Sequence, residues 1–470
     1  MEWKSNGNLA LAMRQKIQLE LAFPSEPRGE ASKTRRGGTE ACAAKADLDD
    51  RAVVRPLMER IVERDNLKKA LAQVRRNKGA PGIDGMRVDD LAAHLKDHWP
   101  TIRTRLLEGA YEPQPVRRVE IPKASGGMRA LGIPTVIDRL IQQAVLQVLQ
   151  EDWDPTFSEA SFGFRPSRSA HQAVKRAQAL IASGHGVVVD IDLEKFFDRV
   201  NHDILMGLVA KRVADRRLLK LIRGFLTAGV LADGLVGPTD EGTPQGGPLS
   251  PLLSNLMLDV LDKELEKRGH AHVRYADDCN IYVRSRRAGE RVMVSVERFL
   301  KSRLKLRVNG EKSAVAFPAQ RKFLGFSYTR GQEPRRRIAP QAIARFKARV
   351  RELTRRTKGS NLHQIVEDLS RYLIGWRGYF GICQTPSVLQ SLERWIRRRL
   401  RAIVWKQWKR GHKRFGELRR RGVGKDLAAQ TAGSAHGPWR LANSPALAIA
   451  LPNAFIETLG LASLTAEASA

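Results

Sequence analysis

Cysteine is scarce in this sequence, and long apolar runs are absent. The three cysteines, Cys42, Cys279 and Cys383, lie far apart and form no CxxC pair, which excludes a cysteine-rich zinc module and suits a reducing compartment. No uninterrupted apolar stretch reaches the length that a membrane span needs. The N-terminus places charged residues around a weak apolar patch and makes a poor signal peptide. We therefore expect a cytoplasmic protein with no membrane partner.

Acidic residues are also in the minority. The chain of 470 residues has 50 Asp and Glu against 82 Lys and Arg, a formal net charge of +32. An excess of this size indicates a polyanionic partner, above all nucleic acid. A basic membrane-surface protein is the competing interpretation, but no amphipathic basic segment stands beside a long apolar run. The length allows two or three domains with a sizeable core.

Two adjacent carboxylates, Asp277 and Asp278, interrupt an alternating apolar pattern over residues 272–283. A period of two rich in Val, Ile and Tyr predicts two short strands that meet at a tight turn. Adjacent carboxylates repel each other, and a divalent cation would neutralise them. A solvated Asp-rich turn is the alternative for such a pair.

A second acidic segment follows three valines, Val187 to Val189. The run predicts a buried central strand whose end exposes Asp190 and Asp192 on the same face. Either carboxylate is a candidate metal ligand, and a salt bridge is the alternative role for one of them. A loop rich in Gly and Pro, residues 241–251, then opens a helix over residues 252–265. Such a loop allows close backbone approach to a nucleotide or template base.

Upstream, residues 116–123 and 128–134 form two strand-like runs joined by a four-residue turn. This pattern predicts a hairpin with Lys123 and Arg129 near its tip. Two cations on a stiff hairpin suit the binding of a triphosphate. Arg can form bidentate hydrogen bonds to phosphate oxygens, and Lys acts as a point charge. A solvated hairpin end is the alternative.

Beyond residue 335 the apolar residues recur at helical spacing, with one apolar stripe over residues 362–376 and another over residues 389–403. We expect Trp376 and Trp395 to lie in the core of these helices. The second stripe carries a row of cations interleaved with tryptophans, which suits phosphate contact and base stacking. The alternative is a solvated basic face. The candidate RNA-binding residues are Arg394, Arg397, Arg398, Arg401 and Lys406.

A strand ending in carboxylates, a Gly-rich loop before a helix and a hairpin with paired aspartates occur in the order typical of a two-metal nucleotidyl transferase. At this point the sequence closely resembles the reverse transcriptase/maturase encoded by bacterial group II introns. The resemblance covers roughly residues 55–330, and it extends more loosely to RYLIGWRGYFGI at residues 371–382. The matching blocks include RNKGAPGIDG (76–85), IPKASGGMRALGIPTVIDR (121–139), SFGFRPSRSAHQAV (161–174), DIDLEKFFDRVNHD (190–203), GTPQGGPLSPLLSNLMLDVLD (242–262), RYADD (274–278), LKLRVNGEKS (304–313) and FLGF (323–326).

The resemblance implies an α+β fold: a right-hand polymerase, with fingers and palm built on an antiparallel sheet, followed by an α-helical thumb/maturase domain. It also implies a metal triad that binds two Mg²⁺ ions. In this family the first catalytic aspartate precedes an aromatic residue by five positions. Asp192 and Phe197 satisfy that spacing, so the implied triad is Asp192, Asp277 and Asp278, with Asp190 structural.

The implied nucleotide-binding residues are Lys123, Arg129, Phe197, Gln245 and Lys312. In the family, Phe197 would discriminate against the ribonucleotide 2′-hydroxyl, and Lys123 and Arg129 would hold the triphosphate. Gln245 belongs to the template-side loop with Gly246 and Gly247. Lys312 matches the basic residue of the block after the active hairpin.

The expected organisation has four parts. Residues 1–50 form a basic N-terminal tail, 51–330 the reverse transcriptase fingers and palm, and 331–415 the helical thumb/maturase domain. Residues 416–470 form a C-terminal tail of unknown role, without a zinc-type endonuclease module. The expected partners are the intron RNA template, a DNA primer or target and dNTPs, and the oligomeric state stays open. The alternatives are an RNA-binding splicing factor with an idle polymerase and a retron or defence-associated reverse transcriptase.

Overall fold

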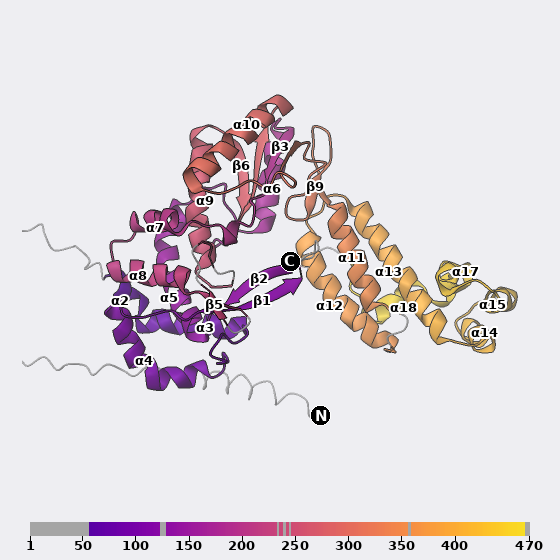
Figure 1. Ribbon diagram of the computed structural model, residues 1–470. Helices are drawn as coiled ribbons and strands as arrows, with labels where there is room; N and C mark the ends of the chain where they lie inside the picture. The colour runs from indigo at the N-terminus through magenta and orange to yellow at the C-terminus, as the bar shows by residue number, and fades with distance from the viewer. Residues whose placement is uncertain are drawn as a thin grey trace, which may run out of the picture.

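The computed structural model describes residues 56–122, 128–232, 235–237, 241–243, 246–355 and 359–465 (Figure 1). The expected N-terminal tail, Lys123 and Gln245 lie outside the described residues, and so does the side chain of Arg129. The described chain is an α+β protein with two four-stranded sheets and a helical C-terminal part, as expected. Among the described residues, no helix combines the length and the apolar character needed to cross a bilayer.

The central sheet has the strand order β6-β7-β3-β8, and all of its pairs are antiparallel. Its strands are β3 (Val187–Ile191), β6 (Ala271–Tyr275), β7 (Asp278–Val283) and β8 (Ala314–Ala316). The predicted hairpin is confirmed, because Tyr275 pairs with Asp278 across the turn. The predicted buried central strand is confirmed as well, since β3 lies between β7 and β8.

Both faces of β3 are buried, which explains its consecutive valines. Val187 and Val189 face a large core that includes Val292 and Val296 of α10 (Arg286–Phe299). Val188 faces a second core built with α6 (Ala170–Ala182) and β9 (Phe326–Tyr328). The strand β9 pairs only with β10 (Arg336–Ile338) among the described strands.

The second sheet has the order β2-β1-β4-β5. Its strands are β1 (Val116–Pro122), β2 (Met128–Ile133), β4 (Val230–Ala232) and β5 (Leu235–Gly237). The predicted antiparallel hairpin is confirmed by the β1–β2 register, which ends at Pro122 opposite Met128. The strand β4 joins β1 in parallel.

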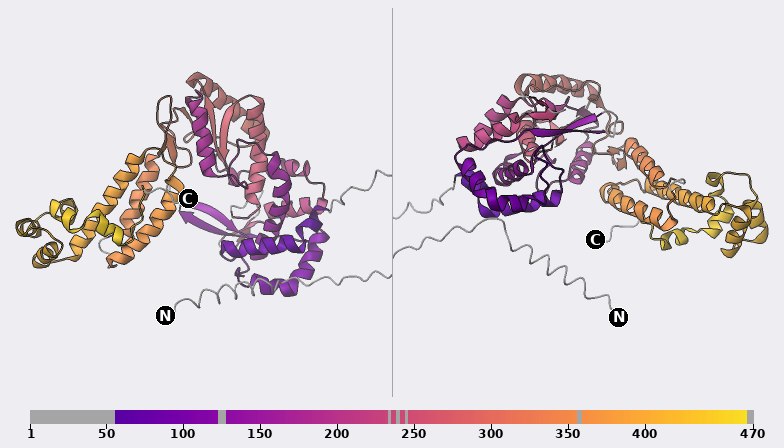
Figure 2. Two further views of the ribbon diagram at one scale, coloured as in Figure 1. Left: turned by 180° about the vertical axis from the view of Figure 1, so that it is seen from behind. Right: turned by 60° about the horizontal axis from the view of Figure 1, so that its bottom comes forward.

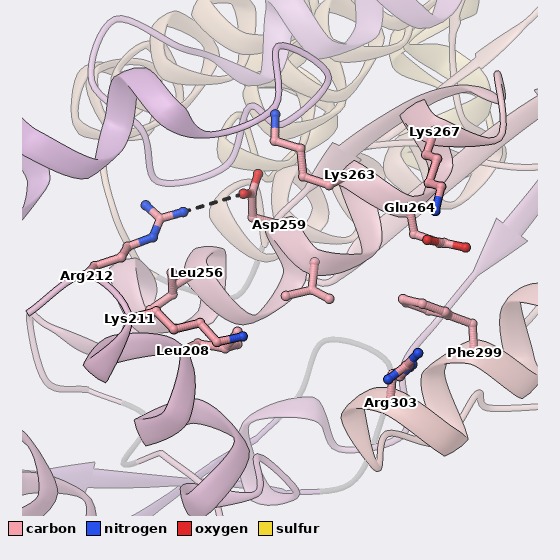
Figure 3. Close-up of a pocket in the computed structure, with 11 residues that line it drawn as sticks. Leu208, Lys211, Arg212, Leu256, Asp259, Lys263, Glu264, Lys267, Phe299 and Arg303 are labelled. Atoms are coloured by element: carbon pink, nitrogen blue, oxygen red, sulfur yellow. Dashed lines mark ion pairs between the residues drawn. The ribbon is translucent and has the colours of Figure 1, made fainter.

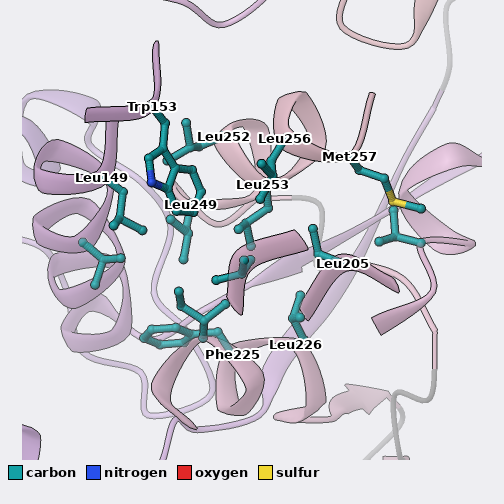
Figure 4. Close-up of a cluster of buried hydrophobic side chains, with 14 of the residues drawn as sticks. Leu149, Trp153, Leu205, Phe225, Leu226, Leu249, Leu252, Leu253, Leu256 and Met257 are labelled. Atoms are coloured by element: carbon teal, nitrogen blue, oxygen red, sulfur yellow. The ribbon is translucent and has the colours of Figure 1, made fainter. Parts of the chain in front are cut away.

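Most helices of this part pack their apolar side chains into the larger of the two cores. Figure 4 shows part of this core, where Trp153, Leu205, Phe225 and Leu253 meet from four helices. The predicted helix after the Gly-rich loop is confirmed as α9. The helices of this part are α2 (Leu57–Ile61), α3 (Arg64–Asn77), α4 (Leu91–Leu107), α5 (Val136–Trp153), α7 (His202–Ala210), α8 (Arg216–Thr227) and α9 (Ser250–Lys267), with short turns η1 (Asp154–Thr156), η2 (Phe196–Asp198) and η3 (Leu300–Leu304).

Three long helices, α11 (Pro340–Leu353), α12 (Leu362–Phe380) and α13 (Pro386–Gln407), form the C-terminal part beside β9 (Figures 1 and 2). Their shared core contains both predicted apolar stripes. Trp376 is buried in this core, as expected, and Trp395 packs half-buried against it.

The described residues from 411 to 465 contain five further helices, most of them in the segment 416–470 that the sequence left as a tail of unknown role. A separate core joins them to Trp405 and Trp408 at the end of α13. Figure 1 shows α14, α15 and α17 grouped at the end of the molecule away from the sheets. These helices are α14 (Gly411–Arg420), α15 (Lys425–Ala432), α16 (Pro438–Leu441), α17 (Pro445–Ala450) and α18 (Asn453–Thr458).

Candidate active site

The turn between β6 and β7 carries Asp277 and Asp278 at one edge of the central sheet. Ala276 in this turn has a φ of +56°, a left-handed conformation that residues other than glycine adopt at an energetic cost. The carbonyl of Ala276 accepts a hydrogen bond of 2.9 Å from Nη1 of Arg274. The buried side chain of Arg274 therefore holds the turn in this conformation.

Arg274 is fully buried, and its guanidinium is neutralised by Asp262 of α9. Nη2 of Arg274 lies 2.5 Å from Oδ2 of Asp262, and Nε lies 2.9 Å from Oδ1. Nη1 also donates to Oδ1 of Asn255 at 3.0 Å, and Asn255 in turn donates to the carbonyl of Gly163 at 2.9 Å. Four polar groups from three segments thus meet behind the aspartate turn.

The carboxylates of β3 lie at the same sheet edge as this turn. The β3–β7 register pairs Ile191 with Cys279, so Asp192, which follows β3, comes opposite Asp278, the first residue of β7. The backbone N–H of Asp192 donates to Oγ of Ser313 at 3.0 Å, and its carbonyl accepts from the N–H of Asn309 at 2.8 Å. These contacts hold Asp192 in place after the strand ends.

Asp190 and Asp192 have different partners. Arg321 binds Asp190, with Nε at 2.8 Å and Nη2 at 2.7 Å from Oδ2, and the Asp190 side chain is 18% exposed. Asp192 faces Nζ of Lys312 at 3.6 Å and is 33% exposed. Asp190 is therefore engaged in a salt bridge, whereas Asp192 is the more accessible carboxylate.

The carboxylates affect one another's ionisation. Burial raises the pKa of Asp278 to about 7, together with the negative charge of neighbouring carboxylates, which belong to Asp277, Asp190 and Asp192. Because the Asp278 side chain is exposed at the sheet edge, we attribute the raised pKa chiefly to repulsion by these carboxylates. Burial also raises the pKa of Asp190, against the opposing effect of Arg321.

No group of three or more His, Cys, Asp and Glu side chains in the described ranges is arranged to hold a metal ion as it stands. The crowding of carboxylates at this edge still fits a divalent cation in charge and donor type, because hard cations prefer carboxylate oxygens. In this structure the ammonium of Lys312 provides part of the neutralising charge at Asp192.

Phe197 lines a cavity of about 280 Å³ between η2, the segment of residues 241–243 and the sheet of β1, β2 and β4. Its carbonyl accepts a 2.7 Å hydrogen bond from the N–H of Thr243, and a Cβ on Gly242 would lie 2.9 Å from that carbonyl. Strand β2 contributes Ala130, Leu131 and Gly132 to the cavity wall. The structure thus brings the predicted sugar-discriminating residue next to the hairpin that carries the predicted phosphate-binding cations.

The Gly-rich loop packs closely on strand β2, and its predicted approach to a nucleotide or template base stays a prediction. Gly246 has a φ of +141°, and a Cβ there would lie 2.6 Å from the carbonyl oxygen of Gly132 in β2. Only glycine fits that contact without a shift of the backbone.

Comparison with known proteins agrees with these features. Residues 121–328 match the family described as reverse transcriptase (RNA-dependent DNA polymerase), and residues 343–422 match the group II intron, maturase-specific domain. Protein YkfC of Escherichia coli (strain K12) is 33% identical over 313 residues, which cover 58% of this chain and 82% of YkfC. This chain belongs to the group II intron reverse transcriptase/maturase family.

Two further relatives carry an intron in their names. The group II intron-encoded protein LtrA of Lactococcus lactis subsp. cremoris is 42% identical over 188 residues, 40% of this chain and 31% of LtrA. An uncharacterized 91 kDa protein in the cob intron of Schizosaccharomyces pombe is 35% identical over 193 residues, 40% of this chain and 24% of that protein. The matched segments thus span about a third or less of these two relatives. The reverse transcriptase domain makes this chain an RNA-directed DNA polymerase, a class of enzyme that uses divalent metal ions.

In this reverse transcriptase, most of the predicted RNA-binding arginines of α13 contact the C-terminal segment of the same chain. Arg398 donates to the carbonyl of Trp439 at 3.0 Å and lies 4.1 Å above its ring. Arg397 pairs with Glu457 at 3.0 Å, and Arg401 donates to the carbonyl of Leu451 at 2.9 Å.

Arg394 and Lys406 have exposed side chains. The proposed RNA-binding role of the whole set stays a prediction, and the structure gives these two the freest access to a ligand.

A cavity of about 520 Å³ lies on another part of the polymerase, between α7, α9 and η3 (Figure 3). Arg212 and Asp259 form an ion pair of 3.8 Å at its wall. None of the predicted site residues lines this cavity. Its mixed charge, with Lys263 and Lys267 beside Glu264, identifies no ligand.

Sequence reasoning missed two features of the site. One is the buried pair of Arg274 and Asp262, and the other is Phe164, an exposed aromatic residue near Tyr275. The signals available were the position of Arg274 directly before the YADD residues and the FGFRP motif at residues 162–166. Neither signal reveals which groups meet in space.

Proposed function

We propose that this chain copies its intron RNA into DNA at the carboxylate edge of the central sheet, and that its C-terminal helices bind the intron RNA during splicing and retrohoming. The observation that supports the first half is the convergence of the β3 terminus and the β6–β7 turn. This convergence brings Asp192, Asp277 and Asp278 to one edge.

In this proposal the three aspartates hold two Mg²⁺ ions. The chemistry that these ions supply when bound is activation of the primer 3′-hydroxyl and neutralisation of the triphosphate charge. Asp192 is preferred over Asp190 because Arg321 already occupies Asp190. Lys312, close to Asp192, would contact the nucleotide or the phosphates next to it.

The cavity beside Phe197 would select the nucleotide. Phe197 would contact the sugar of the incoming dNTP and exclude a 2′-hydroxyl by steric clash. Lys123 and Arg129 would hold its triphosphate, and strands β1 and β2 of the hairpin both contribute to the cavity wall. Gln245 would contact the template.

We further propose the domain limits expected from the sequence, with residues 51–330 as fingers and palm and residues 331–415 as the thumb/maturase domain. The RNA would contact Arg394 and Lys406 first, because Arg397, Arg398 and Arg401 are occupied by the C-terminal segment. A cytoplasmic location is supported by Cys279 and Cys383, which are both free thiols.

The test measures two activities on the same variants. Asp277→Asn should abolish extension of a DNA primer on an RNA template while leaving splicing of the intron RNA intact. Arg394→Gln combined with Lys406→Gln should weaken intron RNA binding and splicing at low Mg²⁺, with a far smaller loss of extension on a short primer–template. If wild-type protein binds and splices the RNA but extends no primer, the polymerase half of the proposal is wrong.

A further inference from the structure

Phe164 is an exposed aromatic residue in a strained backbone conformation beside the catalytic turn. Its side chain is 55% exposed, and its φ is +56°. Large residues rarely adopt this left-handed conformation, and where they do the surrounding structure must enforce it. Because this ring adds little to the core and its backbone is strained, we looked for a functional role for Phe164.

The surrounding structure does enforce it. The segment of residues 160–163 runs beside β6, with the N–H of Phe162 donating to the carbonyl of Arg274 and the N–H of Arg274 donating to the carbonyl of Ala160, each at 2.9 Å. A Cβ on Gly163 would lie 2.3 Å from the backbone nitrogen of Ala276. The loop therefore rests directly on the turn that carries the two aspartates.

Arg165 fixes the other side of Phe164. The Arg165 side chain is 2% exposed, and its guanidinium pairs with Asp154 at 2.8 Å. It also donates to the carbonyl of Ser158 at 2.6 Å and to that of Ser161 at 3.0 Å. With both neighbours held, Phe164 is presented on a rigid loop, and the charged residue next to it is turned inward.

The ring of Phe164 lies next to Tyr275, with ring centroids 6.4 Å apart and an angle of 42° between the planes. Tyr275 comes two residues before Asp277. Under the proposed two-metal reaction, the primer 3′-hydroxyl must reach these aspartates, so the last primer nucleotides must pass this pair of rings. An exposed aromatic face is the group that proteins use to stack on bases or pack on sugars without reading sequence.

We propose that Phe164 is a binding residue for the primer strand, where it packs against one of the last three nucleotides and positions the 3′ end at Asp277 and Asp278. This inference rests on the proposed polymerase function. It assigns no chemical step to Phe164. It predicts a role in duplex affinity and register rather than in metal binding.

The test exploits the strain at this position. Phe164→Gly removes the ring and relieves the left-handed conformation, so the melting temperature should stay the same or rise. The Kd for a DNA primer on an RNA template, measured by fluorescence anisotropy without dNTPs, should rise about five- to a hundredfold. Phe164→Trp should retain the affinity. Phe317→Ala, which alters a similarly exposed phenylalanine (52%) after β8, should change neither quantity.

Abasic nucleotides show whether Phe164 contacts the primer strand or the template strand. A single abasic site at one of the last three primer positions should remove the difference between wild type and Phe164→Gly, whereas abasic sites in the template should preserve it. An unchanged Kd for Phe164→Gly would overturn the proposal, and so would a fall in its melting temperature matching the loss of binding. Loss of the difference only with template abasic sites would also overturn it. Because binding is measured without dNTPs, these results stand apart from a failure of polymerisation itself.

Discussion

Nη1 of Arg274 lies 2.9 Å from the carbonyl oxygen of Ala276, and this hydrogen bond joins the buried interior of the polymerase to the turn that carries Asp277 and Asp278. The same guanidinium forms an ion pair with Asp262 of α9. The left-handed residue of the turn, Ala276, is thus supported by a charge pair that is completely shielded from solvent. The positions of Asp277 and Asp278 depend on this support.

Removing one partner of the Arg274–Asp262 pair should destabilise the protein strongly. Arg274→Ala would leave the Asp262 carboxylate buried without its cation, a change that costs about 3–5 kcal/mol in comparable sites. Arg274→Lys keeps the charge but loses the forked geometry, so we expect a smaller loss of stability together with reduced extension. Urea unfolding measures the free energy. A variant Arg274→Ala as stable as wild type would show that the pair contributes nothing to the fold.

The same pair should make stability depend on acid pH. Burial alone would raise the pKa of Asp262, but the charges and hydrogen bonds of Arg274 and His272 outweigh it and lower this pKa. A folded-state pKa below the unfolded one means that the ionised pair stabilises the protein above the unfolded pKa, near 4. This contribution is lost as the pH falls through the folded pKa. The unfolding free energy of wild type should therefore drop on acidification more steeply than that of Asp262→Asn, and parallel curves would contradict this prediction.

Phe197 should determine sugar selection. Phe197→Val opens the cavity beside Gly242 and β2, so the variant should incorporate ribonucleotides that wild type rejects. The aspartates proposed to bind the metal are untouched, so the Mg²⁺ dependence of dNTP incorporation should stay close to that of wild type. The measurement is the ratio of kcat/KM for dNTP and rNTP. Equal rejection of rNTP by both proteins would assign the discrimination to another side chain.

The basic residues of α13 should divide into two groups. Arg394→Gln and Lys406→Gln remove exposed cations, so each should make the plot of log affinity for intron RNA against log salt shallower by about 0.7–0.9 per lost phosphate contact. Arg398→Ala and Arg401→Ala remove contacts to Trp439 and Leu451, so they should lower the melting temperature. If the Arg394→Gln and Lys406→Gln variants leave the salt slope unchanged, these two residues are only part of a solvated face.

Much of the fold was predictable because the deciding signals are local. The alternation around Asp277 predicts the β6–β7 hairpin, the valine run predicts the central strand β3, and the breakers before Leu252 predict the start of α9. Each signal lies within a few residues of the element that it predicts.

The unpredicted features depend on contacts between distant segments. Asp262 meets Arg274 only because α9 packs behind the hairpin. The sequence around Arg398 shows a cation but not the Trp439 carbonyl that it binds, 41 residues away. The exposed, left-handed Phe164 depends on Arg165 and Gly163 being fixed on either side. Periodicity does not report such pairings.

The most direct test of the central claim is primer extension on an RNA template by four single variants of the carboxylate edge. Asp192→Asn, Asp277→Asn and Asp278→Asn each remove charge from the proposed metal site, so each should reduce the rate by at least about a hundredfold, the equivalent of several kcal/mol of lost stabilisation. Asp190→Asn only weakens the salt bridge to Arg321, so it should cause a much smaller reduction. Substantial extension by Asp277→Asn or Asp278→Asn, or an inactive Asp190→Asn beside an active Asp192→Asn, would contradict the account.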